Sequence, residues 1–448
     1  MTMKPTIILA FLVSLILIAP EALNAQSNIT AVEKNWPQWR GPSETGVALY
    51  GNPPVEFSET KNIRWKTEIP GKGHATPIIW GDQIIVLTAV ATDKKPAKGE
   101  VTQEAGRMGP PSSGTEFIHK FQVISVDRKT GKIQWDRTVK EEIPVERTHT
   151  LGSWASNSPV TDGENIYAYF GSRGLFCLDF KGNVLWDRDF GQMEIIMSFG
   201  EGSSPSIYKD KIIVVWDHEG GSFIVALDKK TGKEVWKVDR DEITSWASPL
   251  IVEVNGQAQV ITAATNKVRS YDFETGKLIW ECTGLTRNVI PNPVYADGIL
   301  YVMSGYHGNA LMAINLAKAK GNITGTGVIL WKYNQDTPYA PSPMVMDGKL
   351  YFLKANNGTI TCLDAKDGKV NYINEKLEGI LNIYSSPTGV GDHLYIAAEG
   401  IVDVIKAGPS FVLLASNKLD DTFHASPVVI GNDLYLRGFK YLYCISAE

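Results

Sequence analysis

Several features are scarce or missing in this 448-residue chain, and each absence excludes a class of protein. The chain has four cysteines and no two are neighbours; it also has no Cys-x-x-Cys-His run to attach a haem. The nucleophile motif of a serine hydrolase is missing. No long basic run is present and the net charge is -5, which disfavours nucleic acid as a partner. After the first 25 residues, no apolar run is long enough to cross a bilayer.

The first 25 residues resemble a secretory signal peptide. Lys4 precedes an apolar run over residues 7–19, which is shorter than the roughly 20 residues of a membrane-spanning helix. Pro20 ends the run, and Leu23-Asn24-Ala25 provides small residues for cleavage before Gln26. A retained membrane anchor is the alternative. No cysteine lies near this point, so no lipid anchor is expected. We predict an exported protein, periplasmic or extracellular, without a transmembrane segment in its mature form.

The rest of the chain is a repeat in which a proline, an apolar strand, Thr-Gly-Lys and a tryptophan recur. The opening prolines are Pro77, Pro159, Pro205, Pro249, Pro293, Pro343, Pro387 and Pro427. Most of the intervals are 40 to 50 residues, a spacing typical of the blades of a β-propeller. The first interval is longer because residues 91–119, rich in Pro, Gly and Lys, interrupt the first blade as a flexible insert.

The ends of the repeat predict how the ring closes. The eighth copy stops at Glu448 without its outermost strand, whereas residues 62–66, with Trp65, form an extra strand before the first copy. We therefore predict an all-β, eight-bladed propeller of four-stranded blades, closed by this N-terminal strand. The predicted divisions are a signal peptide over 1–25, an N-terminal docking segment over 26–61, and the propeller over 62–448.

Cysteine and tryptophan positions in the repeat indicate packing. Cys177, Cys362 and Cys444 align with Ser125, Ala226 and Ser270 in other copies, a small buried position on the third strand. They belong to different blades, so no disulfide is expected between them. The recurring tryptophans are expected to fill the seams between blades.

At these residues, and from Trp36 to the end, the sequence resembles the pyrroloquinoline-quinone (PQQ)-like β-propeller repeat proteins. The runs Trp216–Phe223, Trp246–Pro249 and Thr337–Pro343 resemble an exported bacterial subgroup without an assigned activity. More distant resemblance extends to quinoprotein alcohol dehydrogenases and to the propeller lipoprotein that helps to assemble outer-membrane barrels.

The sequence departs from both of these better-understood relatives. Quinoprotein dehydrogenases carry two adjacent cysteines beside the quinone and a Glu-Asn-Asp set for calcium, and neither can be matched here residue by residue. The lipid-modified cysteine of the assembly lipoprotein is also missing. The resemblance therefore implies the fold, and it implies neither activity.

Strand order predicts which face of the disc is functional. Tight turns such as Asp297-Gly298 and the Thr-Gly-Lys turns connect first to second and third to fourth strands, on one face. Longer loops connect the blades, and second to third strands, on the other face. Six of the seven histidines map to this loop face, and only His393 lies opposite. Residues just before each opening proline should surround a central funnel, a natural ligand site.

The candidate ligand-binding residues all lie on the loop face: His74, Arg147, His149, Trp154, Asn157, Glu201, Asp217, His218, Glu219, Trp246, Arg287, Tyr339 and His424. Any of them can instead pack against neighbouring loops. Asp217, His218 and Glu219 can form a metal site with His149 and Glu201, or a charged loop tied by Arg147.

Two functions from different classes remain open. We favour a non-catalytic binding or scaffold propeller that engages a small molecule or protein segment through the funnel face. The alternative is an oxidoreductase using PQQ and calcium, with Glu201 or Asp217 as the base; missing cofactor motifs make PQQ with calcium less favoured. A degraded propeller inside a larger assembly is a third reading. The sequence identifies no ligand, no metal and no oligomeric state.

Overall fold

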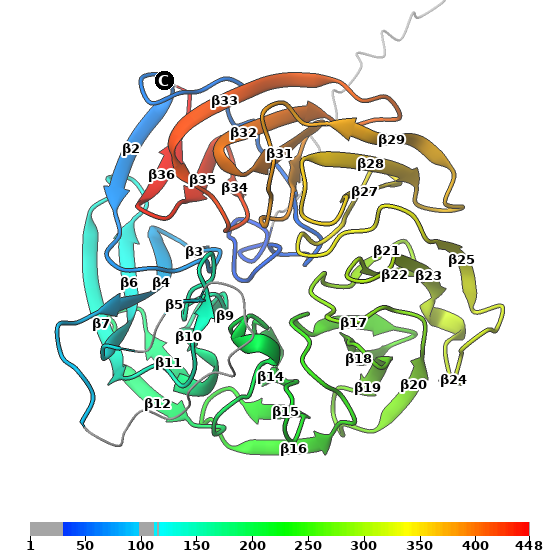
Figure 1. The fold of residues 1–448 in the computed structure, drawn as a ribbon, viewed down its shortest axis with the longest axis horizontal. Coiled ribbons are helices and arrows are strands. Elements are labelled where there is room, and N and C mark those ends of the chain that lie inside the picture. The colour runs from blue at the N-terminus through cyan, green and yellow to red at the C-terminus, as the bar shows by residue number, and fades with distance from the viewer. Residues whose placement is uncertain (1–29, 98–111, 114–115, 448) are drawn as a thin grey trace, which may run out of the picture.

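The computed structural model describes residues 30–97, 112–113 and 116–447, and its fold is a disc of eight four-stranded antiparallel sheets around a central axis (Figure 1). This confirms the predicted all-β, eight-bladed propeller. In each blade the first strand lies at the axis and the fourth at the rim. Within the described residues, helix is limited to three 3-10 turns, Gly171–Arg173, Ile196–Ser198 and Leu316–Lys318.

The strands of the first four blades are β3 (Ile78–Trp80), β4 (Gln83–Ala91), β6 (His119–Asp127) and β7 (Ile133–Glu142) in blade 1; β9 (Val160–Thr161), β10 (Asn165–Tyr169), β11 (Leu175–Asp179) and β12 (Val184–Arg188) in blade 2; β13 (Ser206–Tyr208), β14 (Lys211–Trp216), β15 (Phe223–Asp228) and β16 (Glu234–Asp239) in blade 3; and β17 (Leu250–Val254), β18 (Gln257–Ala263), β19 (Val268–Asp272) and β20 (Leu278–Cys282) in blade 4.

The remaining blades contain β21 (Val294–Ala296), β22 (Ile299–Ser304), β23 (Ala310–Asn315) and β25 (Ile329–Tyr333) in blade 5; β26 (Met344–Met346), β27 (Lys349–Leu353), β28 (Thr359–Asp364) and β29 (Val370–Lys376) in blade 6; β30 (Thr388–Val390), β31 (His393–Ala397), β32 (Glu399–Lys406) and β33 (Leu413–Thr422) in blade 7; and β34 (Val428–Ile430), β35 (Asp433–Arg437) and β36 (Tyr441–Ile445) in blade 8. Four short strands join this frame: β1 (Val47–Ala48), β5 (Ser112–Ser113), β8 (Thr148–His149) and β24 (Gly321–Asn322).

The ring closes with the N-terminal strand, as predicted. Strand β2 (Ile63–Glu68) pairs antiparallel with β36 and supplies the fourth strand of blade 8. Residues from the start and the end of the chain thereby share one sheet, so opening blade 8 would expose a strand edge.

A seam of tryptophans joins successive blades. In the fourth strand, Trp65, Trp135, Trp186, Trp236 and Trp331 each donate an indole N–H to a carbonyl of the next blade. The ring lies against the glycine of that blade's Thr-Gly-Lys or equivalent turn. At Gly276, a Cβ would meet Trp236 at 2.7 Å, and the φ of +72° favours glycine as well. The turn glycine therefore serves both the turn and the seam.

Small residues on the third strand pair with tryptophans of the fourth strand. Cys177 pairs with Trp186, Ser270 with Trp280, and Cys444 with Trp65. All four cysteines are free and buried, which confirms the prediction of packing residues for Cys177, Cys362 and Cys444. A larger side chain at this position would collide with the ring opposite.

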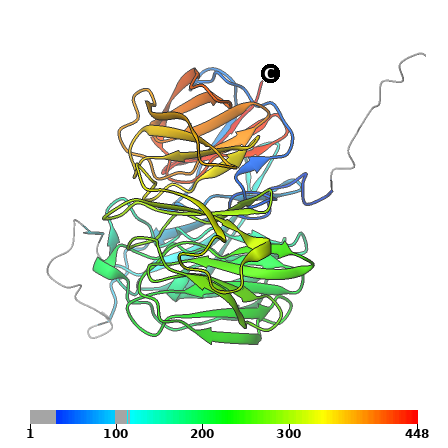
Figure 2. The ribbon, with the colours of Figure 1, turned by 90° about the vertical axis from the view of Figure 1, so that its right-hand side faces the viewer.

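The N-terminal segment, here residues 30–61, crosses the disc on the turn face (Figures 1 and 2). Trp36 exchanges backbone hydrogen bonds with Ile79, and β1 pairs in parallel with β30 at the axis of blade 7. The expected signal peptide over 1–25 lies outside the described residues, as does most of the expected insert over 91–119. No helix within the described ranges is long and apolar enough to span a membrane.

Candidate functional site

A closed ring of hydrogen bonds surrounds the axis at the residue before each opening proline. In every blade this residue donates its backbone N–H to the side-chain oxygen of the equivalent residue in the next blade, over 2.8–3.0 Å. The order is Thr76, Ser158, Ser204, Ser248, Asn292, Ser342, Ser386, Ser426 and back to Thr76. Proline keeps the preceding residue extended, which directs each N–H sideways to its neighbour. We call these eight residues the throat ring.

Above the throat ring, the loop face is hollowed into a funnel cavity of about 450 Å³. Every blade contributes to its wall. Aromatic rings dominate the lining: Phe199, Trp246, Tyr306, Tyr339 and Tyr384, with the imidazoles of His74, His149 and His424. Hydroxyl groups of the throat ring line its depth, and Glu201 is the one acidic residue among the described residues of the wall. The cavity therefore suits an uncharged ligand with apolar surface.

Trp39 forms the floor of this cavity from the opposite side of the disc. Its indole N–H donates to Ser426 Oγ of the throat ring, at 3.3 Å. The neighbouring Arg40 is buried and donates to the carbonyl oxygens of Pro343 and Pro387. Burial lowers the pKa of Arg40 to about 9. These contacts hold Trp39 in the axial channel, so the funnel is closed at its base.

The thirteen sequence candidates separate into distinct positions. Six line the funnel: His74, His149, Glu201, Trp246, Tyr339 and His424. Trp154, Asn157 and Arg147 lie around a small side pocket that also reaches Glu201. Asp217 borders a third small pocket with Trp246. Arg287 is exposed on the loop face, His218 contacts Gly221 of its own loop, and Glu219 accepts a hydrogen bond from Thr244 in the loop after β16.

Two buried carboxyl groups lie at the side pocket, which is formed by blades 1 and 2 and the loop after blade 2. Burial and the neighbouring Glu201 raise the pKa of Glu146 to about 8. Glu201 accepts hydrogen bonds from Ser172 N and Oγ, and burial raises its pKa too. Its carboxyl packs so closely on Gly171 that a Cβ there would lie 1.3 Å from Oε2. Near neutral pH Glu146 therefore favours the protonated form, which is unsuited to a general base.

Histidines and aromatic rings gather where blades 8 and 1 meet the funnel. The rings of His74 and His424 lie 4.9 Å apart, and both contact Phe439 at 4.8 Å. Burial lowers the pKa of His424 to about 4 and that of His74 well below its usual value. Both imidazoles are therefore neutral at pH 7, and they add aromatic surface without charge.

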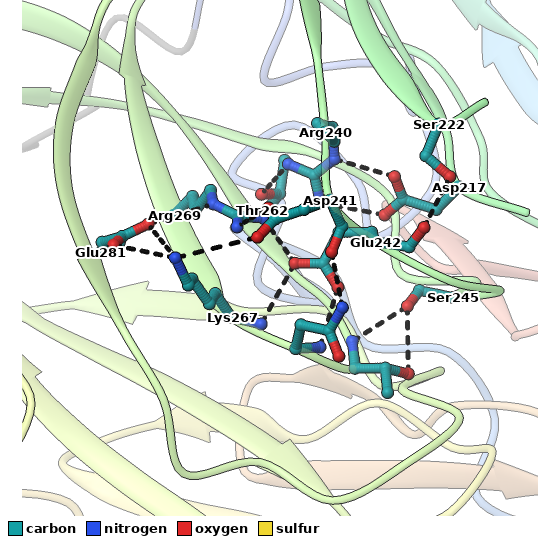
Figure 3. A network of polar contacts seen from close by, with 12 residues as sticks. Asp217, Ser222, Arg240, Asp241, Glu242, Ser245, Thr262, Lys267, Arg269 and Glu281 are labelled. Atoms are coloured by element: carbon teal, nitrogen blue, oxygen red, sulfur yellow. Dashed lines mark hydrogen bonds and ion pairs between the residues drawn. The ribbon is translucent and has the colours of Figure 1, made fainter.

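The suggestion that Arg147 ties the Asp217–Glu219 loop is wrong. Arg147 is exposed, whereas Asp217 forms a bidentate ion pair with Arg240 at 2.8 and 2.9 Å, both side chains being fully buried (Figure 3). Arg240 comes from the loop after β16, a partner that sequence spacing does not reveal. Its guanidinium also donates to Thr262 and Tyr271. Because Asp217 is fully engaged, it has no free oxygen to act as a base.

The proposed metal site does not assemble either. His218 Nδ1 accepts backbone hydrogen bonds from Glu194 and Gly220, and Glu219 accepts from Thr244. Each of these side chains is used to order a loop. Among the residues that the structure describes, no group of three or more His, Cys, Asp or Glu is placed to hold a metal ion.

Sequence reasoning missed three parts of the funnel. Trp39 was expected only to dock on the disc, and Tyr384 was not singled out, although it lies two residues before the seventh Ser-Pro. The residues before the opening prolines were expected to surround the funnel, but the hydrogen bonds that join them into the throat ring were not predicted. The position of these residues relative to the opening prolines of the repeat was the signal that could have identified them.

Comparison with known proteins gives one family. A family model described as outer membrane protein assembly factor BamB matches residues 119–374, more than half of the chain. The factor of that name from Yersinia pestis is 22% identical over 348 residues, which cover 73% of this chain and 81% of the relative. The one from Francisella tularensis is 26% identical over 210 residues, covering 44% of this chain and 42% of the relative.

Solved structures agree in fold. BamB from Moraxella catarrhalis has a TM-score of 0.53 at 16% identity, covering 80% of this chain and 100% of that chain. A quinohemoprotein alcohol dehydrogenase from Comamonas testosteroni has a TM-score of 0.59 at 10% identity, covering 94% of this chain and 81% of that chain. At such identities these likenesses show a shared fold and nothing about activity.

Proposed function

The chain belongs to the family of outer membrane protein assembly factor BamB, and from this premise we propose that it is a non-catalytic scaffold whose funnel face binds a segment of a partner protein. The relatives are named for assembling proteins, which supports a protein rather than a small metabolite as the partner. The binding groups would be the funnel residues among the sequence candidates, His74, His149, Glu201, Trp246, Tyr339 and His424, with the aromatic rings beside them.

The observation that carries this proposal is the composition of the funnel wall. Aromatic rings such as Trp246 and Tyr306 offer large apolar faces at little entropic cost, a preference typical of protein-binding surfaces. Throat-ring hydroxyls accept backbone N–H groups, which leaves their own protons available to donate. Peptide carbonyls are acceptors of the kind that such donors would bind.

A quinone cofactor fits this wall poorly. PQQ carries three carboxylates, which require cationic partners, and none of the described funnel residues is Lys or Arg. The carboxylates suggested as a base, Asp217 and Glu201, are held by Arg240 and Ser172 respectively. The oxidoreductase reading therefore lacks both a cofactor cradle and a free base.

We further propose that the protein acts outside the cytoplasm. Its family is named for outer membrane protein assembly, and the apolar start of the sequence is consistent with a signal peptide. A periplasmic or an extracellular setting would each satisfy these observations.

Site-specific photo-crosslinking tests the proposed face. A photoreactive phenylalanine analogue replaces Tyr306 or Tyr339 in the funnel, and Lys366 on the turn face serves as the control position. We expect defined protein adducts from the funnel positions that disappear when Trp246 is also changed to Ala. Adducts from Lys366 alone would contradict the proposal, and so would PQQ-dependent dye reduction by the purified protein.

A further inference from the structure

The turn face, which the sequence predicts to serve only turn geometry, contains a cavity of about 570 Å³. One wall is the N-terminal segment, with Pro37, Gln38 and Glu44. The other wall is made by blades 1 to 5, chiefly Ile207–Lys209 and Leu250–Glu253. We call this space the turn-face cavity. It lies on the opposite side of the Trp39 floor from the funnel, so the two are separate.

The N-terminal segment satisfies backbone groups at the axis in several blades. The first strand of each blade has one edge that faces the axis and has no neighbour within its own blade. Trp36 pairs with Ile79 in blade 1, and Pro37 O accepts from Thr161 N in blade 2. In blade 7, β1 adds to β30 as a parallel strand, and Gly46 O accepts from Gly389 N. The N-terminal segment therefore covers the inner edges of these blades by pairing with their first strands.

At the inner edge of blade 4, the N-terminal segment places a side chain where it adds a strand in blade 7. The inner-edge N–H of Ile251 on β17 lies close to the carboxyl group of Glu44, a side chain instead of a strand. Alternation along β17 turns the N–H of Glu253 to the same side. Four consecutive residues, Leu250–Glu253, line the turn-face cavity, so the backbone edge itself forms the wall. Glu44 has a φ of +57°, and there the segment turns away and leaves this edge uncovered by a strand.

The side chains around the turn-face cavity are suited to an uncharged occupant. Apolar surface comes from Trp80, Ile207, Tyr208 and Tyr295. The charged groups on the wall are already paired, Lys229 with Asp162 at 2.8 Å and Lys209 with Glu253 at 3.8 Å. Burial raises the pKa of Glu44 to about 8, so this carboxyl is neutral at pH 7. A charged group entering here would lose hydration without gaining a free partner.

We propose that the turn-face cavity is a second docking site, in which an extended, uncharged polypeptide segment of a partner protein adds to the inner edge of β17 as β1 adds to β30. The edge supplies backbone hydrogen bonds, and the apolar wall selects the side chains. Glu44 occupies the Ile251 N–H until the segment arrives. This site is independent of the proposed funnel function and would stand if that proposal failed.

A synthetic peptide provides the test on the full-length protein. The probe is acetyl-Thr-Gly-Val-Ala-Leu-Tyr-amide, the sequence of residues 45–50 that contains β1. Its matched partner is the same peptide N-methylated at Val and Leu, which removes two backbone donors and retains the side chains. By calorimetry we expect the parent to bind, and the methylated peptide to bind about tenfold or more weakly.

Variants of the protein locate the site. Glu44→Gly frees the Ile251 N–H and suits the positive φ, so we expect parent affinity to rise about threefold to tenfold. Ile251→Pro removes that N–H and should abolish binding, whereas Glu164→Ala, exposed on the same face, should change nothing. If Ile251→Pro fails to fold, the two-peptide comparison on the native protein still decides. Equal affinities of the two peptides, or no binding of the parent at millimolar concentration, would overturn the proposal.

Discussion

The throat ring makes a quantitative prediction about the stability of the propeller. In Ser342→Ala, the backbone N–H of Asn292 loses its acceptor, which lies 2.9 Å away in the native protein. Ser342 is 1% exposed and Asn292 is 8% exposed, so water cannot easily replace the hydroxyl. Leaving a buried donor unpaired costs about 1–3 kcal/mol, more than the net value of an ordinary hydrogen bond. We expect the free energy of unfolding to fall by that amount.

Urea denaturation followed by tryptophan fluorescence and circular dichroism measures this loss. Ser342→Thr should restore most of the stability, because Thr76 occupies the equivalent place in blade 1. Ser410→Ala, on an exposed residue, is the matched control and should stay within about 0.5 kcal/mol of the native protein. The reasoning is refuted if Ser342→Ala behaves like Ser410→Ala, or if the threonine variant is as unstable as the alanine variant.

Three further perturbations test other parts of the structure. Trp65→Ala in the closing strand should cost about 3–5 kcal/mol by thermal unfolding, because the ring is 9% exposed and fills the seam; a loss below about 1 kcal/mol would contradict that role. Glu146 has a folded pKa of about 8, raised above its ordinary value, so its stabilising contribution is present below pH 4.5 and is lost as the pH rises through 8. Glu146→Gln should remove this loss, and unchanged pH profiles between pH 5 and 9 would argue against it. Arg240→Met leaves Asp217 as a buried unpaired charge and should cost about 3–5 kcal/mol, while the added change Asp217→Leu should recover most of it; failure to recover would mean that packing of the arginine stem dominates.

The fold could be predicted because each blade repeats the same set of local contacts. The residue–proline pair forms the throat ring, the Thr-Gly-Lys turn receives a tryptophan from the neighbouring blade, and a small residue faces that ring. These contacts join blades that are adjacent in sequence, so the pattern is visible without knowing the three-dimensional structure. Closure followed for the same reason, since Trp65 was a fourth-strand tryptophan without a blade of its own.

The candidate site was harder to predict because side chains in the loops contact residues of other loops and blades. His218 and Glu219 were attractive as ligands, yet the structure uses them to hold backbone N–H groups of Gly220 and Thr244. Asp217 was matched with Arg147, but Arg240, closer in space and more deeply buried, satisfies it. The spacing of the repeat indicates on which face of the disc a loop lies, but it does not indicate the direction of each side chain. The face could therefore be inferred, and the individual roles could not.

The N-terminal segment determines what the two faces can bind, and repeat analysis could not show this because the segment belongs to no repeat. Eight blades around an axis would leave a channel with inner strand edges exposed along it. Trp39 blocks that channel and turns the loop face into a closed funnel, while Arg40 anchors it on carbonyls of blades 6 and 7. Beyond Trp39, the same segment covers the inner edges of blades 1, 2 and 7, whereas at blade 4 the side chain of Glu44 lies at the inner edge. One unrepeated stretch thus creates both cavities and keeps them apart, so a substitution that loosens it, such as Arg40→Met, should alter binding on both faces at once. A change confined to the funnel would show that the floor and the turn-face wall move independently.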